Sequence, residues 1–105
     1  MRFDESDEQL LRKIFQKIGG LSSADDTDYD TITNIVNRVG GRAMPDDLKV
    51  PLIGKWFRAL GGAYGPNSND TEPTLYAKIL KAYGGQPKPG DSKVLLLRKI
   101  LDSLP

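Results

Sequence analysis

A pair of adjacent glycines recurs along this chain at nearly even intervals. The pairs begin at Gly19, Gly40, Gly61 and Gly84, and the chain ends at Pro105, so successive marks lie 21 to 23 residues apart. A fixed period of this size is typical of a protein built from tandem copies of one short structural unit. We therefore expect five copies that together form a single helical repeat domain over residues 1–105.

Apolar residues occupy the same five positions in each copy, which lie nine, eight, five, four and one residues before the first glycine. In the first copy these residues are Leu10, Leu11, Ile14, Phe15 and Ile18. At about 100° per residue they cover roughly 140° of one helix face, which is typical of a helix with one side in a core. Only Thr31 breaks this apolar stripe. The pattern predicts an all-α protein with five short amphipathic helices near residues 7–18, 28–39, 51–60, 72–83 and 93–104.

Both ends of these helices carry recognisable signals. Thirteen residues before the aligned glycines stand hydroxyl residues that can cap a helix N-terminus, namely Ser6, Thr27, Thr71 and Ser92. Ser6 and Gln9 have the spacing of a capping box. At the other end Gly19, Gly40, Gly61 and Gly84 can adopt the left-handed conformation that closes a helix.

The third copy departs from this pattern. Leu48 takes the place of the capping hydroxyl, and Gly54 weakens the helix interior. Pro51 is favoured as a first helical residue, so we expect this helix to begin late, at residue 51. Asp46 and Asp47 are then expected to cap a short preceding turn.

Helices of this length are marginal in water by themselves, so their apolar stripes must be buried against one another or against a partner. The segments between them are long enough to let each helix reverse or cross the preceding one. For a chain of 105 residues, the number of stripe residues favours a compact bundle over an open helical stack.

Composition disfavours catalysis and cofactor binding. The chain contains neither Cys nor His, so thiolate chemistry and the usual neutral-pH general base are absent. We expect no catalytic residues, no cofactor and no small-molecule substrate. The segment from Asp26 to Asp30 begins like a calcium loop, but Thr31 stands where the turn glycine belongs and Asn37 where the bidentate glutamate belongs, so no metal site is predicted.

Charge and hydropathy also limit the partners. Fifteen bases against 14 acids give a net charge of +1, which disfavours nucleic acid as a partner. No apolar run is long enough to span a bilayer, and the first residues lack the features of a secretory signal, so we expect synthesis in the cytoplasm and no membrane association.

Two groups of residues remain open to a functional interpretation. Lysines recur six residues before the aligned ends, at Lys13, Lys55, Lys78 and Lys99. They are interpreted as solvated lysines beside a core, with phosphate contacts as the alternative. Trp56, Phe57 and Tyr64 are the candidate partner-binding residues, although core packing is the favoured interpretation of the first two and packing over a helix end explains Tyr64 equally well.

Residues 84–92, GGQPKPGDS, lead into residues 95–101, LLLRKIL. This stretch resembles a tandem element of small virion and appendage-associated structural proteins of tailed bacteriophages, in which L-L-x-K-I-L helices alternate with G-G-x-P-x-P-G-D-[ST] linkers. The resemblance is closest over residues 84–104, and Leu10 to Ile14 repeat the helix part.

The resemblance implies a non-catalytic structural or adaptor protein of a phage particle, as a decoration, neck or appendage-anchoring component. Its location would be the virion, and its partners would be other phage structural proteins or copies of itself. The alternative is a soluble protein-binding or regulatory module that stays in the cytoplasm, with nucleic-acid binding less favoured.

Overall fold

Five α-helices of 11 residues each form the regular structure of the chain. The computed structural model describes residues 6–21, 25–65 and 69–104. Within these ranges the helices are α1 (Asp7–Lys17), α2 (Asp28–Arg38), α3 (Lys49–Ala59), α4 (Glu72–Ala82) and α5 (Lys93–Ser103), and no strand is present. The predicted all-α fold is confirmed.

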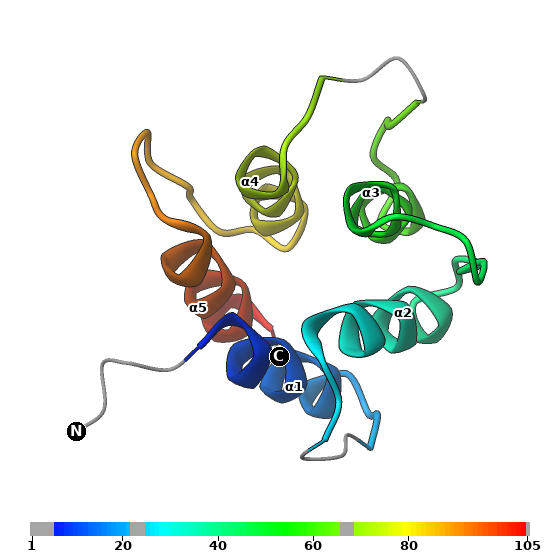
Figure 1. Cartoon of the computed structure of the whole chain (residues 1–105). Coiled ribbons are helices and arrows are strands. Elements are labelled where there is room, and N and C mark those ends of the chain that lie inside the picture. Colours follow the sequence, from blue (N-terminus) through cyan, green and yellow to red (C-terminus); the bar gives the residue numbers. More distant parts are fainter. Residues whose placement is uncertain (1–5, 22–24, 66–68, 105) are drawn as a thin grey trace.

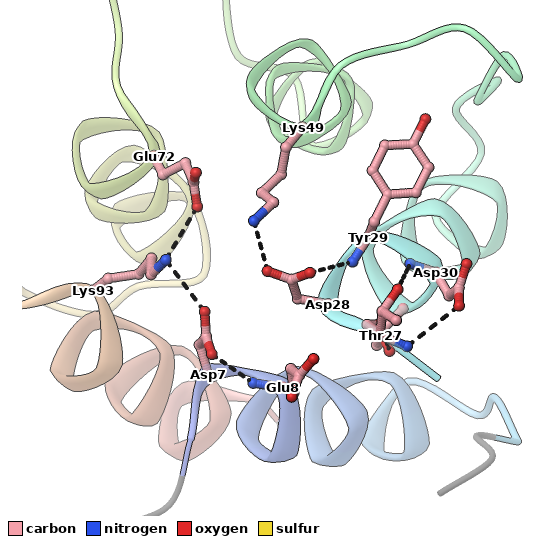
Figure 2. Close-up of polar contacts among 10 residues, drawn as sticks. Asp7, Glu8, Thr27, Asp28, Tyr29, Asp30, Lys49, Glu72 and Lys93 are labelled. Carbon is pink, nitrogen blue, oxygen red and sulfur yellow. Dashed lines mark hydrogen bonds and ion pairs between the residues drawn. The ribbon is translucent and has the colours of Figure 1, made fainter. Parts of the chain in front are cut away.

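The five helices close into a ring (Figure 1). Each helix packs against its neighbours in the chain, and α5 packs against α1. The first turns of all five helices point toward the ring centre on one side (Figure 2). We call this side the N-terminal face and the opposite side, with the last turns and the Gly-Gly segments, the C-terminal face. The molecule measures 41 × 32 × 22 Å, which confirms the compact form over the open stack.

The core lies inside the ring and consists of the apolar stripes. Its fully buried members include Leu10, Ile35, Ile53 and Ile79, one from each of the first four helices. Thr31, the polar residue within the stripes, is also fully buried. Its hydroxyl donates a hydrogen bond of 2.9 Å to the carbonyl oxygen of Thr27, so the core leaves this group satisfied.

Hydroxyl residues precede four of the helices at the N-cap position, namely Ser6, Thr27, Thr71 and Ser92. In α1 the Gln9 N–H donates to Ser6 Oγ at 3.2 Å, and the Ser6 N–H donates to Gln9 Oε1 at 2.9 Å. In α5 the Leu95 N–H donates to Ser92 Oγ at 3.1 Å. These bonds satisfy backbone donors that the first turn of a helix leaves without partners.

The predicted late start of α3 is wrong. This helix begins at Lys49, in register with the others, and Pro51 is its third residue. Proline is tolerated there because N–H groups of the first turn have no partner within the helix. Leu48 is the N-cap and makes no capping bond. Since Pro51 has no N–H, a hydroxyl at position 48 could accept only from Val50.

The two glycines of each pair are required for different reasons. Gly61 has φ +93°, a conformation in which a side chain would be strained. The N–H of Gly62 donates to the Phe57 carbonyl oxygen at 3.0 Å, closing the helix end as in a Schellman motif. A Cβ at Gly62 would lie 2.3 Å from the Phe57 ring. The first glycine therefore provides the turn and the second lets a helix side chain fold over it.

We expect the N-caps to differ in their contribution to stability. Ser92→Ala should lower the free energy of unfolding by about 1 kcal/mol because a helix donor loses its acceptor. Leu48→Ser should change it by less than about 0.5 kcal/mol, because Pro51 offers no N–H to the new hydroxyl. Urea unfolding of both variants measures the difference, and equal effects would contradict this account.

Candidate functional site

The first residue of each helix contributes a charged side chain to one cluster on the N-terminal face (Figure 2). We call Asp7, Asp28, Lys49, Glu72 and Lys93 the axial cluster. The Lys93 ammonium lies 3.2 Å from Asp7 Oδ2 and 3.3 Å from Glu72 Oε1. The Lys49 ammonium lies 2.7 Å from Asp28 Oδ2. Ion pairs near the ring centre thus connect α4, α5 and α1 in one group and α2 with α3 in another.

The order of charges around the axial cluster follows from the odd number of helices. A ring of five cannot alternate in sign, so one pair of neighbours must be alike. Asp7 and Asp28 are that pair, and each bonds to a lysine on its other side. The five side chains are 21 to 33% exposed, and ion pairs with this much solvent contact contribute on the order of 0–1 kcal/mol each.

The axial cluster shifts the pKa values of three of its members. Partial burial opposes ionisation of Asp28, but the hydrogen bond and charge of Lys49 outweigh it and lower the pKa of this carboxyl. The bond to Asp28 raises the pKa of Lys49. Burial acts against the Lys93 ammonium, yet the hydrogen bond that it donates to Asp7 and the charge of Glu72 raise its pKa. The geometry therefore favours the charged forms of Asp28, Lys49 and Lys93.

The ammonium groups occupy the position that a bound cation would take in a purely acidic ring. Lys93 bridges two carboxylates from different helices, and Lys49 neutralises a third. Within residues 6–21, 25–65 and 69–104, no three Asp, Glu, His or Cys side chains are grouped so as to hold a metal ion. The arrangement can fix the register of the helices and present charge on one face.

Trp56 belongs to an aromatic group inside the ring rather than to its surface. It is fully buried, and its ring packs edge-on against Tyr76 with centroids 6.4 Å apart. Its indole N–H donates to the Tyr83 hydroxyl at 3.2 Å. Burial raises the pKa of Tyr76, with the acids of the axial cluster adding to this shift. A fully buried tryptophan has no surface to offer a partner, so Trp56 joins α3 to α4 as a core residue.

Tyr64 and Phe57 each cover a glycine and are only partly buried. A Cβ at Gly54 would lie 2.5 Å from the Tyr64 ring. The linker after α3 therefore folds back and places Tyr64 on the middle of that helix. Gly54, which weakens the helix by propensity, is the position that makes this contact possible. The partner-binding role of Phe57 and Tyr64 stays a prediction.

Lysines near the middle of three helices hold the preceding linkers. The Lys55 ammonium bonds to the Asp47 carboxylate and, at 2.9 Å, to the Arg42 carbonyl oxygen. Lys99 lies 2.7 Å from Asp91. Lys78 pairs with Asp70 at 2.9 Å in the same way. These lysines therefore bind the linkers that precede their helices and are not only solvated side chains beside the core.

The aspartates of these pairs also build the turns that lead into the helices. The Met44 N–H donates to Asp47 Oδ2 at 2.8 Å, and the Asp47 N–H returns to the Met44 carbonyl at 3.1 Å. The predicted short turn before α3 is thus confirmed for Asp47. The Lys88 N–H donates to Asp91 Oδ2 in the same manner at 2.8 Å.

The axial cluster and the lysine–aspartate pairs both correspond to patterns in the sequence, but these patterns are less conspicuous than the apolar repeat. An acid stands eight residues before a lysine in four copies, at Glu5, Asp47, Asp70 and Asp91, and the structure shows the last three as ion pairs. The residues that directly follow the N-caps also include both acids and bases. This mixture suits a closed ring in which all helices start on one face, because these residues then lie next to one another. In an antiparallel bundle the same residues would be divided between two ends.

No helix in the described part of the chain is both long and apolar enough to cross a membrane. Comparison of the chain with protein-family models, curated proteins and solved structures found no match.

Acid should weaken the ring through Asp28. Its ionised form stabilises the folded chain above the unfolded-state pKa of 3.8, and this contribution is lost as pH falls through the lower pKa of the folded state. Asp28→Asn should therefore lower stability at neutral pH and flatten the acid side of the stability profile. Urea unfolding of both proteins from neutral to acid pH measures this. Parallel profiles would contradict the role of Asp28.

Gly54→Ala should destabilise the protein, although this change normally stabilises a helix by about 1 kcal/mol. The added methyl group would collide with Tyr64, and overpacking typically costs about 1–3 kcal/mol. In a Tyr64→Ala background the same substitution should become neutral or stabilising. A double-mutant cycle from denaturant unfolding tests this coupling, and additive effects would exclude it.

Proposed function

We propose that this chain is a non-catalytic structural or adaptor protein of a tailed-phage particle, acting through protein–protein contacts. It would be located in the virion as a decoration, neck or appendage-anchoring component. Its partners would be other structural proteins of the particle or further copies of the same chain. The resemblance of residues 84–104 to the phage element is the basis for the phage origin.

The contact between the two halves of that element carries the structural part of the proposal. The aspartate of the G-G-x-P-x-P-G-D linker is Asp91, and the lysine of the L-L-x-K-I-L helix is Lys99. They form an ion pair of 2.7 Å, and Asp47 with Lys55 forms an equivalent pair at α3. Because the charged residues of this linker and helix pattern bind each other, the pattern stabilises the fold. It supports a scaffold function rather than a catalytic one.

The distribution of apolar residues supports action through the outer surface. The stripes of all five helices lie in the core of the ring or pack against it. Among the described residues, the large apolar side chains that remain exposed are Leu21, Met44, Leu48 and Leu95, and none of them belongs to a stripe. A partner would therefore meet a preformed, rigid ring and would not need to open it.

Particle association tests this proposal directly. Phage particles released by cells that produce the chain would be purified on a density gradient and analysed by mass spectrometry. We expect the polypeptide in the particle band in a constant ratio to the main capsid protein. A non-structural protein of the same phage serves as the control for carry-over. If the chain stays in the soluble fraction with that control, the proposal is wrong and a soluble binding module is favoured.

A further inference from the structure

Leu48 is the residue that the fold itself explains least. It occupies the N-cap of α3, where the other copies have a hydroxyl residue. It makes no capping bond there, and its side chain is 74% exposed. Exposing a large aliphatic side chain forgoes the free energy that its burial would provide. An apolar residue in this position is expected to contact something outside the ring.

Leu48 has charged neighbours of both signs in the chain, among them the acid Asp46 and the base Lys49. The exposed carboxylate of Asp46 lies two residues before it, and the axial cluster begins with the next residue, Lys49. Lys49, the first residue of α3, lies on the N-terminal face (Figure 2). Leu48 is thus an apolar projection with an acidic neighbour at one end of α3.

A shallow apolar groove lies at the opposite end of the same helix. It is formed between α3 and α4 and has a volume of about 510 Å³. Phe57 and Leu60 of α3 and Ala82 of α4 provide apolar walls. Lys81, which is exposed, lies at the groove. The groove is therefore an apolar recess with a basic neighbour on the C-terminal face.

We propose that Leu48 of one copy enters the groove of Phe57, Leu60 and Ala82 on a second copy, with Asp46 opposite Lys81. The projection and the groove are complementary in both hydropathy and charge. They belong to opposite ends of one helix of about 16 Å, so a single molecule cannot join them. The occupant of the groove is a second copy of this chain.

The charges of the two faces favour the same arrangement. The first turns of α1, α2 and α4 carry acids, which outnumber the two lysines that open α3 and α5; the acids are Asp7, Glu8, Asp28, Asp30 and Glu72, and the lysines are Lys49 and Lys93. The last turns of four helices carry a base each, namely Lys17, Arg38, Arg58 and Lys81. Stacking the N-terminal face of one ring on the C-terminal face of the next brings these charges together and aligns the helix dipoles head to tail.

This contact is heterologous because the two surfaces differ. Each copy offers both the projection and the groove, so copies can continue to add until a stack closes or is capped. The inference deepens the proposed function by naming the partner as a second copy, yet it does not depend on a phage origin.

Sedimentation velocity of the full chain over a range of concentrations tests the stacking. We expect reversible self-association that weakens as salt rises. Leu48→Ser should weaken it about tenfold or more. Leu21→Ser is the matched control, because it also removes an exposed leucine, at 94% exposure, but lies outside the groove and should therefore weaken association much less than Leu48→Ser. Circular dichroism would establish that both variants keep the helical fold.

A charge exchange identifies the partner surfaces. Asp46→Lys and Lys81→Glu should each weaken self-association, because each places like charges opposite one another. Mixing the two variants in equal amounts should restore assembly, since the reversed charge of one protein then meets the reversed charge of the other. A chain that is monomeric at every soluble concentration would overturn the proposal. Equal effects of Leu48→Ser and Leu21→Ser, or no rescue on mixing, would also overturn it.

The two proposals fail separately. Association with purified particles without self-association would leave the phage function standing and remove the second copy as the partner. Stacking in solution by a chain that never enters particles would do the reverse.

Discussion

Closure of the ring between α5 and α1 is the constraint on which the rest of the structure depends. An 11-residue helix is about 16 Å long and is marginal in water, so each one must bury its stripe against others. In an open stack the first and last helices would leave half of that surface in solvent. Contact between α1 and α5 removes both ends, and every stripe then faces the same core.

Closure with all helix starts on one face requires each linker to return along the molecule to the beginning of the next helix. The structure manages this return with few residues. A Gly-Gly pair stops the helix, because the first glycine takes a positive φ and the second accepts a side chain against its backbone. An aspartate then builds a turn and bonds to a lysine in the middle of the following helix, as Asp91 and Lys99 do. The linker is thereby fixed along the helix that it precedes.

The third repeat shows how one unit can change without losing its place in the ring. Pro51 removes the donor that a capping hydroxyl would use, which lowers the cost of Leu48 at the N-cap. Gly54 gives up helix propensity, and Tyr64 uses the free space above it. Each departure from the repeat pattern is thus matched by a second one nearby. These paired changes give α3 an exposed leucine at one end and an aromatic cover along its side.

The sequence by itself determined the helices, because their apolar period, hydroxyl caps and glycine stops are local features that act within a few residues. It also indicated a compact bundle, since so many stripe residues need a common core. Local pattern did not reveal that Pro51 is the third residue of α3, because proline is tolerated anywhere in a first turn. Only the tertiary structure decided that the helices are parallel and that Asp7, Asp28, Lys49, Glu72 and Lys93 meet at one centre. These residues lie about 21 positions apart in the chain, and their contact depends on ring closure, a property of all five helices together.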